Sequence, residues 1–260
     1  MQIAFYETDI TQAQWDFLQP MLPAAAQTGR PRTCLRKLIN AMLYMAKTGC
    51  QWRLLPKEFP PRSTVHGIFR SWRQNGTLAS IHNQLRAFAR GLQGHRSRPT
   101  AAILDSQTVR SAGLAAEAGY DAAKRIKGRK RFLLVDTLGH VLAAWVLPAD
   151  CPEREGAKTL LEEALGTFGW LRKLWVDGGY SGPDFEEQVR ALRSKLEVQV
   201  VNRIEGAKGF HALPRRWVVE RTFAWIMQHR RLTRDFERLA ESVVGWIHIA
   251  MIRIMLRRLA

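Results

Sequence analysis

Apolar residues between positions 1 and 95 recur every three or four residues, which is the spacing of one face of an α-helix. Thr11 and Ser63 stand where hydroxyl side chains commonly cap helices, and Gly49 is typical of a helix end. The pattern predicts helices that begin near residues 11, 33, 63 and 77, with an Asn75-Gly76 turn before the last. The expected inner faces are Trp15 and Leu18; Leu35, Leu38, Ile39, Met42 and Leu43; Val65, Ile68, Phe69 and Trp72; and Leu78, Ile81, Leu85 and Phe88.

The hydrophobic pattern changes after a segment rich in Gly, Arg and Pro at 90–100, so we place a domain boundary there, between 1–95 and 96–260. Beyond it, short apolar runs alternate with helical patterns, which predicts an α/β domain. Strands separated by a helix are usually parallel neighbours. The expected strands are 101–109, a hairpin over 131–147 that turns at Leu138-Gly139, 171–176 and 196–203; the expected helices are 155–165, 183–192, 215–231 and 239–258.

Composition adds a basic character to this picture. The chain contains 46% apolar residues, enough for a core, and 40 Lys and Arg against 23 Asp and Glu give a net charge of +17. Such an excess indicates a polyanionic partner, with nucleic acid favoured over a membrane surface. The apolar stretch 243–256 is short and contains His248 and Arg253, so we expect a buried helix and not a membrane span.

The termini and cysteines exclude other classes of protein. The first ten residues lack a basic region followed by an apolar run, so we expect no signal peptide. Cys34, Cys50 and Cys151 form no CxxC pair and have no histidine at zinc-finger spacing. We therefore expect no structural zinc site and a reducing, cytosolic environment.

Three acidic residues occupy unusual positions. Asp105 interrupts an apolar strand, Asp177 ends one just before Gly178-Gly179, and Glu220 lies in an apolar helix. Neighbouring strands would bring the aspartates to about 4.8 Å, and a divalent cation would relieve their repulsion. That geometry suits two-metal phosphoryl transfer. Two of them have simpler readings, because Asp177 could be a turn former and Glu220 could pair with Arg216 or Arg221. Asp105 is harder to explain, since Asp is depleted in strand interiors.

These acids lie in segments that resemble a known family. The segments are "LINAMLYMAKTGCQWRLLPKEFPP" (38–61), "AAILDSQTVRSA" (101–112), "GYDAAKRIKGRKRFLLVDTLGHVLAAWVLPAD" (119–150), "LWVDGGYSG" (174–182) and "LPRRWVVERTFAWIMQHRRLTRDFE" (213–237). They resemble DDE transposases of the IS5 family of bacterial insertion sequences, in the IS4/IS5 superfamily. The resemblance implies an RNase H-like catalytic domain after an all-α domain of helix-turn-helix type. It assigns the catalytic and metal-binding roles to Asp105, Asp177 and Glu220.

The resemblance also implies an activity. The expected enzyme binds the terminal inverted repeats of its element, cleaves DNA and transfers 3′-OH ends to target DNA with two Mg²⁺ ions, for which Mn²⁺ could substitute. The expected partners are double-stranded DNA and further copies of the chain, as a dimer or larger synaptic assembly at the cytoplasmic nucleoid. A DNA-binding repressor without chemistry, and an RNase H-like nuclease without strand transfer, stay open as alternatives. Related elements carry a Y-x2-R-x3-E-x6-K pattern, from which Leu213 and Met227 depart.

Basic residues cluster where DNA contacts are expected. The run "KRIKGRKR" (124–131) contains no acid, and we favour a phosphate-binding role over a solvated hairpin edge. Arg70 and Arg73 could lie on a recognition helix or on an ordinary solvated face. The segment 28–33 is more typical of a linker than of a minor-groove arm. The complete set of expected DNA-binding residues is Arg70, Arg73, Lys124, Arg125, Lys127, Arg129, Lys130, Arg131, Arg216, Arg221, Arg230 and Arg231.

Overall fold

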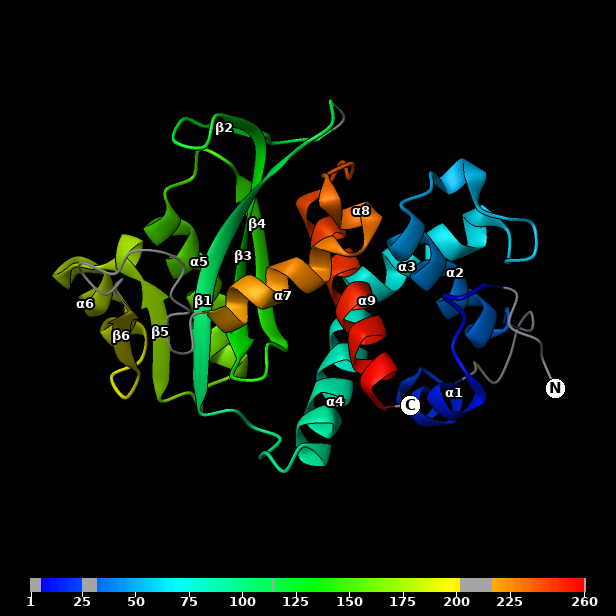
Figure 1. Ribbon diagram of the computed structural model, residues 1–260, viewed down its shortest axis with the longest axis horizontal. Helices are drawn as coiled ribbons and strands as arrows, with labels where there is room; N and C mark the ends of the chain where they lie inside the picture. Colours follow the sequence, from blue (N-terminus) through cyan, green and yellow to red (C-terminus); the bar gives the residue numbers. More distant parts are fainter. Residues whose placement is uncertain (1–5, 25–31, 114, 202–216, 260) are drawn as a thin grey trace, which may run out of the picture. The chain divides into compact units, whose positions relative to one another are not determined.

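The chain forms two compact units in the computed structural model, which describes residues 6–24, 32–113, 115–201 and 217–259 (Figure 1). The helical unit comprises Met1–Gly94, Ile226–Arg234 and Glu241–Ala260. The sheet unit comprises His95–Trp225 and Asp235–Ala240. The division near residue 95 lies where the sequence pattern changes. The C-terminal helices join the helical unit, whereas the sequence pattern placed them in the second domain.

The helical unit follows the predicted helical spacing closely. Thr11 caps the first helix through a reciprocal capping box with Gln14. Gly49 ends the second in a left-handed conformation with φ of 71°, which glycine adopts without strain. The helices are α1 (Gln12–Leu18), α2 (Leu35–Thr48), α3 (Arg62–Gln74), α4 (Thr77–Leu92), α8 (Arg230–Thr233) and α9 (Ala240–Leu259). No helix in the described ranges is long and apolar enough to cross a membrane.

Two expectations about these helices were wrong. Ser63 does not cap α3, because the helix already begins at Arg62 and Pro61 occupies the cap position. Phe88 does not belong to the inner face of α4, since 41% of it is exposed and its ring centroid lies 4.0 Å from that of Phe17. Aromatic rings at this distance form favourable pairs, so Phe88 is stabilised by a ring partner and not by burial.

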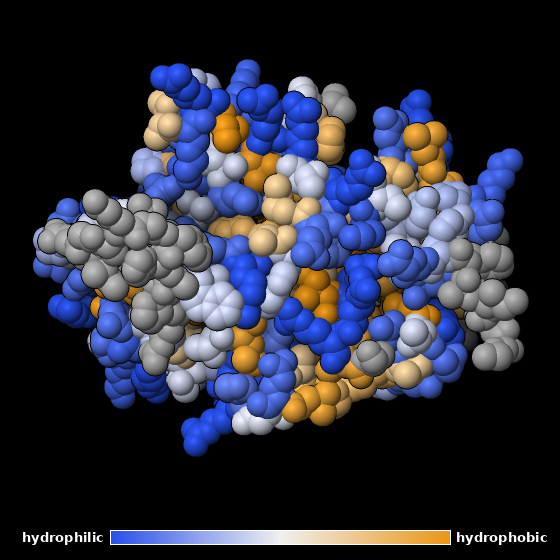
Figure 2. Space-filling view, viewed as in Figure 1, coloured by the Kyte–Doolittle hydropathy of each residue, from blue (hydrophilic) through white to orange (hydrophobic). Residues whose placement is uncertain are grey.

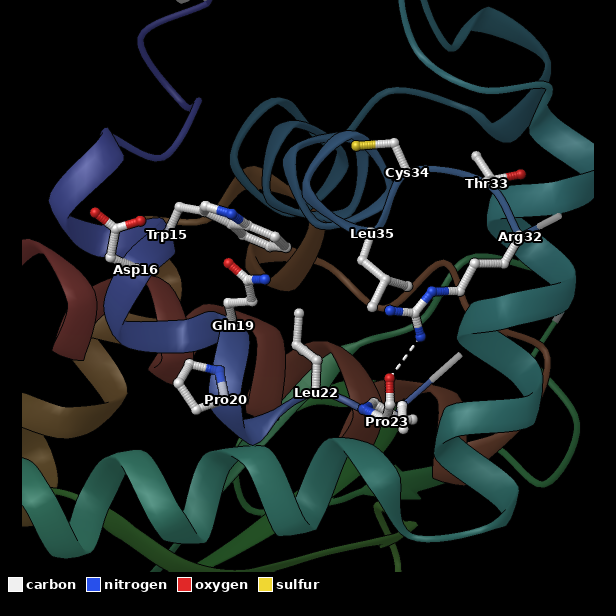
Figure 3. Close-up of a pocket in the computed structure, with 11 residues that line it drawn as sticks. Trp15, Asp16, Gln19, Pro20, Leu22, Pro23, Arg32, Thr33, Cys34 and Leu35 are labelled. Carbon is white, nitrogen blue, oxygen red and sulfur yellow. Dashed lines mark hydrogen bonds between the residues drawn. The ribbon is translucent and has the colours of Figure 1, made fainter. Parts of the chain in front are cut away.

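A pocket opens between the end of α1 and the start of α2 (Figure 3). Trp15, Leu22 and Leu35 give it an apolar wall, and Arg32 donates a hydrogen bond across it to the Pro23 carbonyl at 2.5 Å. The segment that joins Ala24 to Arg32 in the chain lies outside the described residues. We therefore assign this pocket no role.

The sheet unit is built on a mixed sheet with strand order β2-β3-β1-β5-β6, in which β4 also pairs with β3. The central strand pair β1–β3 is antiparallel, whereas β1–β5 and β5–β6 are parallel. The parallel pairing expected of strands separated by a helix is confirmed for β5 and β6, whereas β4 and β5, which are also separated by a helix, are not neighbours. The strands are β1 (Ala101–Arg110), β2 (Gly119–Asp121), β3 (Ile126–Asp136), β4 (Val141–Pro148), β5 (Lys173–Asp177) and β6 (Glu197–Val201).

Helices cover both faces of this sheet. On one face, α5 (Glu153–Thr167) and α6 (Pro183–Leu192) pack over a continuous apolar core with residues of β1, β3 and β5. Gly156 brings α5 close to β3, because a Cβ at this position would overlap the Phe132 ring. On the opposite face lies α7 (Trp217–Met227), whose Thr222 hydroxyl donates to the Gly139 carbonyl at 2.8 Å (Figure 1).

The structure departs from the predicted elements at two places. The short strand β2 was not predicted, because three residues are too few to form a period-two pattern. The expected helix 215–231 is interrupted at Gln228–His229 and continues as α8, and its first two residues lie outside the described ranges. The expected strand 196–203 is described only as far as Val201.

A buried ion pair holds residues 235–240 to the sheet. Arg129 Nε of β3 donates to Asp235 Oδ2 at 2.7 Å, and both side chains are 1% exposed. The Ser111 hydroxyl also donates to this carboxylate at 3.4 Å, and the Glu237 N–H donates to its other oxygen at 3.0 Å. A buried charge without its partner is strongly destabilising, so this pair fixes where the segment docks.

Replacing the acid should therefore destabilise the sheet unit. We expect Asp235→Ala to lower the free energy of unfolding by about 3–5 kcal/mol, because the Arg129 charge stays buried without its carboxylate. The matched control is Glu162→Ala, whose exposed pair with Lys158 at 3.9 Å should contribute at most about 0.5 kcal/mol. Urea denaturation followed by circular dichroism measures both. Equal losses in the two variants would show that the buried pair adds nothing.

Candidate functional site

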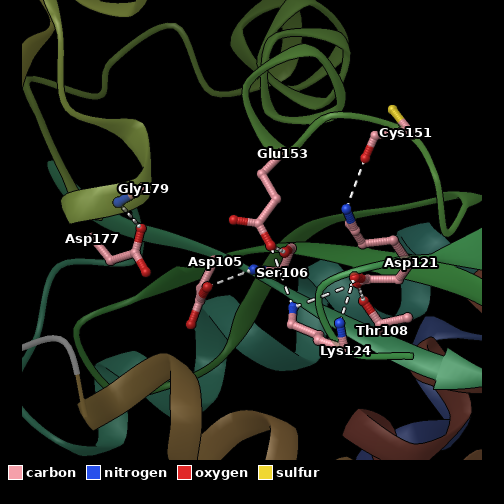
Figure 4. Close-up of polar contacts among 10 residues, drawn as sticks. Asp105, Ser106, Thr108, Asp121, Lys124, Cys151, Glu153, Asp177 and Gly179 are labelled. Carbon is pink, nitrogen blue, oxygen red and sulfur yellow. Dashed lines mark hydrogen bonds and ion pairs between the residues drawn. The ribbon is translucent and has the colours of Figure 1, made fainter. Parts of the chain in front are cut away.

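Asp105 and Asp177 occupy matching positions on neighbouring parallel strands. The last paired residues of β1 and β5 are Ile103 and Trp175. Each aspartate follows two residues later, so the two occupy equivalent positions just beyond the end of this ladder. Paired strands are about 4.8 Å apart, so the two aspartates leave the sheet from neighbouring points. β5 stops at Asp177, whereas β1 continues past Asp105 to Arg110, and Figure 4 shows both side chains together with that of Glu153.

Each of these carboxylates accepts a local backbone hydrogen bond. Asp105 Oδ1 accepts from the Ser106 N–H at 2.7 Å, and Asp177 Oδ1 accepts from the Gly179 N–H at 2.9 Å. Asp177 is thereby the cap of a short 3-10 helix (Gly178–Tyr180), so it does act as a turn residue. The bonds orient both side chains. A turn role and a metal-binding role can therefore belong to the same carboxylate.

Glu153, at the start of α5, brings a third carboxylate to this place. Its Oε1 accepts from the Ser106 hydroxyl at 3.0 Å and lies 3.3 Å from Lys124 Nζ (Figure 4). A Cβ built on Gly179 would lie 3.4 Å from Glu153 Oε2 and 3.1 Å from Asp177 Oδ1, so these two acids approach one point. The sequence analysis did not single out Glu153, because acids are common in the first turn of any helix.

The pKa of a buried tyrosine, Tyr180, is raised by its burial and also by the charges of all three acids. Tyr180 is fully buried, and this burial raises the pKa of its phenol far above the ordinary value. The negative charges of Asp105, Glu153 and Asp177 raise that pKa further, while the Ser106 hydroxyl opposes the effect. The phenol therefore stays protonated. Since three carboxylates act on one buried group, negative charge is concentrated here, and such a concentration favours a bound cation.

Glu220 lies on a different element. It is an exposed residue in the first turn of α7. The helix is fastened to the β3–β4 turn, because Arg221 donates to the Leu138 carbonyl at 3.0 Å. The Arg221 guanidinium also stacks on Trp217 and Trp225, 4.3 and 4.4 Å from the ring centroids. Glu220 is therefore carried by a helix with a fixed attachment to the sheet.

The donor chemistry at this site fits a hard divalent cation. Mg²⁺ and Mn²⁺ prefer carboxylate oxygens, which Asp105, Asp177 and Glu153 offer. Within the described ranges, however, no three His, Cys, Asp or Glu side chains are close enough together to hold a metal ion. The structure thus brings the two aspartates together and leaves the expected group of Asp105, Asp177 and Glu220 incomplete.

The basic run 124–131 divides into an interior and an exterior part. Arg129, Lys130 and Arg131 are buried, with 1%, 6% and 1% exposure. Lys130 donates to the Cys151 carbonyl at 2.7 Å, and burial lowers the pKa of Arg131 to about 10. These three side chains face internal partners and present no surface to DNA, which corrects our reading of the run as one phosphate-binding track. Arg125 and Lys127 are exposed, as is Lys124, which pairs with Glu153.

The other expected DNA-binding residues also differ in their exposure and in their partners. Arg70 and Arg230 are exposed. Arg73 is paired with Glu241 at 3.3 Å. Arg231 is buried, donates to the Cys50 carbonyl at 2.9 Å and stacks on Trp246, so its role is structural. Arg216 lies outside the described residues, as does Leu213.

Comparison with known proteins identifies the two parts of the chain separately. Residues 10–82 match the family described as "Putative transposase of IS4/5 family", and residues 96–255 match "Transposase DDE domain". The chain is 37% identical over 121 residues to "Putative transposase for insertion sequence element IS402" of Burkholderia cepacia, covering 44% of this chain and 56% of that protein. It is 32% identical over 66 residues to "Uncharacterized protein y4sN" of Sinorhizobium fredii (strain NBRC 101917 / NGR234), covering 25% and 53%. The chain thus aligns with about half the length of these curated relatives.

The match to the DDE domain extends over more than half of the chain and contains Asp105, Asp177 and Glu220. This domain implies an RNase H-like fold, in keeping with the mixed sheet and its flanking helices. The aspartates that the register of β1 and β5 brings together lie in that domain, and the helices before it match the IS4/5 transposases. The chain therefore belongs to the family of transposases with a DDE domain, and its N-terminal part is similar to the IS4/5 transposases.

Proposed function

We propose that this chain is the transposase of an IS5-type insertion sequence. In this proposal it binds the terminal inverted repeats of the element, cleaves DNA and transfers the 3′-OH ends to target DNA. The observation that carries the proposal is the register of β1 and β5, which aligns Asp105 with Asp177 inside a DDE domain. The net charge of +17 supports a DNA partner, because phosphate neutralisation supplies much of the affinity for DNA.

In the proposed site, Asp105, Asp177 and Glu220 hold two Mg²⁺ ions, for which Mn²⁺ could substitute. Bound ions of this kind activate the attacking oxygen and stabilise the leaving oxygen of a phosphodiester. The chain's own contribution is to hold the ligands in place. The N–H groups of Ser106 and Gly179 orient the two aspartates, and Glu220 joins them from the first turn of α7.

Glu153 serves the same site as an accessory acid. It accepts a hydrogen bond from Ser106, the neighbour of Asp105, and it approaches Asp177 across Gly179. It also holds the Lys124 ammonium beside the carboxylates, where a cation could contact a substrate phosphate. Loss of a group that orients metal ligands typically lowers metal affinity or activity by roughly 10- to 100-fold.

The helical unit provides recognition of the element ends. In this reading α3 is the second helix of a helix-turn-helix, and Arg70 on its exposed surface reads the DNA. Two DNA ends must be joined together, so a dimer or larger synaptic assembly is expected. A repressor without chemistry and a nuclease without strand transfer are the competing functions, and the first experiment below separates them.

Asp105→Asn should abolish cleavage and strand transfer while DNA binding is retained. Removing one metal-binding charge costs several kcal/mol of transition-state stabilisation, which corresponds to a loss of roughly 10³-fold or more in rate. The assay mixes purified protein, DNA carrying the element ends and supercoiled plasmid with Mg²⁺. The matched control is Asp184→Asn, an exposed aspartate of α6.

The products of this assay decide between the functions. Joined products that vanish only in Asp105→Asn support the transposase. Cut but unjoined DNA would indicate a nuclease, and specific binding without any cleavage would indicate a repressor. Cleavage by Asp105→Asn at the wild-type rate would refute the assigned catalytic site.

Glu153→Gln should weaken divalent-metal binding by roughly 10- to 100-fold, the usual effect of losing a group that orients metal ligands. Calorimetric titration of the full chain with Mn²⁺ measures this directly. Glu155→Gln is the matched control, because Glu155 lies in the same first turn of α5 and is exposed. Unchanged Mn²⁺ affinity in Glu153→Gln, with normal cleavage, would show that this acid is only a partner for Lys124.

Arg70→Ala should weaken binding to the element ends more than binding to random DNA. A lost base contact costs about 1–3 kcal/mol of discrimination, or roughly 5- to 150-fold. Fluorescence anisotropy with the two DNAs at one salt concentration measures the ratio. An equal loss on both DNAs would demote Arg70 to a phosphate contact and would argue against α3 as the recognition helix.

A further inference from the structure

A basic pocket lies at the other end of the sheet unit's central strand. It is formed by the last residue of β1, the segment that follows it, β2 and the start of β3. Its volume is about 660 Å³, within the range of about 300–1,000 Å³ that is usual for small-ligand sites. None of the carboxylates described above lines it. In Figure 2, mostly hydrophilic residues cover the end of the sheet unit that carries β2.

Three exposed cations line this pocket: Arg110, Arg125 and Lys127. Within the described part of the chain, none of the three side chains makes a hydrogen bond or an ion pair. All three are therefore available to bind a ligand. Glu117 contributes one opposing charge, so the lining is positive overall. Unpaired cations around a concave surface concentrate anions, and phosphate groups are the anions that a DNA-processing enzyme meets.

The pocket also contains an exposed aromatic ring. Tyr120 is 55% exposed, and its Cα partner in the β2–β3 ladder is Lys127. Directly opposed residues of antiparallel strands project to the same face, so the ring and the ammonium lie together. Aromatic rings beside cations are the combination by which proteins bind single-stranded nucleic acid, with bases stacked on the rings.

The backbone at this site is unusual. Arg125 has a φ of 54°, in the left-handed region that residues other than glycine rarely adopt. Such conformations cost about 1 kcal/mol or more and cluster at ligand-binding positions. Here the conformation belongs to one of the three cations that line the pocket.

The same hairpin reaches the carboxylates. Lys124, which precedes Arg125, lies 3.3 Å from Glu153. Along β1, Arg110 follows Asp105 by five positions, a distance of roughly 17 Å in a strand. A DNA strand that passes the carboxylates could therefore reach the pocket within a few nucleotides.

We infer that this pocket binds an unpaired nucleotide of the DNA substrate, with phosphates on Arg110, Arg125 and Lys127 and the base stacked on Tyr120. The inference rests on the proposed function for the source of the DNA. Base stacking distinguishes it from a simple phosphate track, because bases inside a duplex cannot reach a side-chain ring without leaving the stack. The pocket is thus a site for single-stranded DNA close to the place of cleavage.

The test compares two probes in the absence of divalent metal: a blunt duplex, and the same duplex with a short single-stranded thymidine tail. Wild-type protein should bind the tailed probe more tightly in fluorescence anisotropy. Tyr120→Ala should remove most of that difference, a loss of roughly 5- to 150-fold for one stacked base. Tyr120→Phe retains the ring and should behave as wild type, which guards against an effect on folding.

A second variant and a matched control test the cations of the pocket. Lys127→Gln should weaken binding of the tailed probe and reduce the dependence of its affinity on salt by about one unit of slope. Arg190→Gln neutralises an exposed cation of α6 in the same unit and should leave the tail-dependent difference unchanged. The inference is overturned if Tyr120→Ala weakens both probes equally, or if it leaves both unchanged.

This assay separates failure of the inference from failure of the proposed function. A tail preference that depends on Tyr120 in a protein that neither cuts nor joins DNA would support the pocket and refute the transposase activity. Normal strand transfer by a protein without any tail preference would refute the pocket and leave the proposed function in place.

Discussion

The parallel pairing of β1 with β5 is the constraint on which the candidate site depends. Ile103 and Trp175 are buried in this pairing, and burial of large apolar side chains contributes roughly 2 kcal/mol each. The same register carries Asp105 and Asp177 to neighbouring positions two residues later, where their charges repel. The apolar core therefore holds two carboxylates in a place that electrostatics alone would not choose. In the proposed site, a bound cation would remove this repulsion and would so link the stability of this sheet to its chemistry.

The strands and the two aspartates could be predicted because their signals are local. An apolar run that ends at Asp177 and a second that contains Asp105 are visible in the sequence, but their pairing is not, because a hairpin and a helix separate β1 from β5 in the chain. Glu153 could not be found in this way. Its position depends on how α5 packs on the sheet, where Gly156 meets Phe132, and on where Gly179 turns the chain after β5. Those are long-range contacts, and an acid in a first helical turn gives no local sign of them.

The basic run 124–131 also could not be interpreted correctly from the sequence alone. By composition it is one uniform stretch, yet Lys127 is exposed whereas Arg129 is buried against Asp235, more than a hundred residues away. Charge density along the sequence predicts a polyanion partner for the whole chain, but it cannot tell which cations have acidic or carbonyl partners inside. Once the inner cations are assigned to structural roles, the charge available to DNA at this hairpin is smaller and more localised than the run of letters indicates.

What remains exposed is arranged along a single strand. β1 extends past its pairing with β5, and Asp105 lies in this extension. The strand ends at Arg110, which lines the pocket together with Arg125, Lys127 and the ring of Tyr120. The first position favours metal ions and the second favours phosphates, so opposite charges are separated by roughly 17 Å of rigid strand. A flexible anionic polymer can bind both at once, with a metal ion mediating its contact at one end and cations binding it directly at the other. The sheet, which fixes this separation, would then set which phosphate of a bound DNA strand lies against the carboxylates.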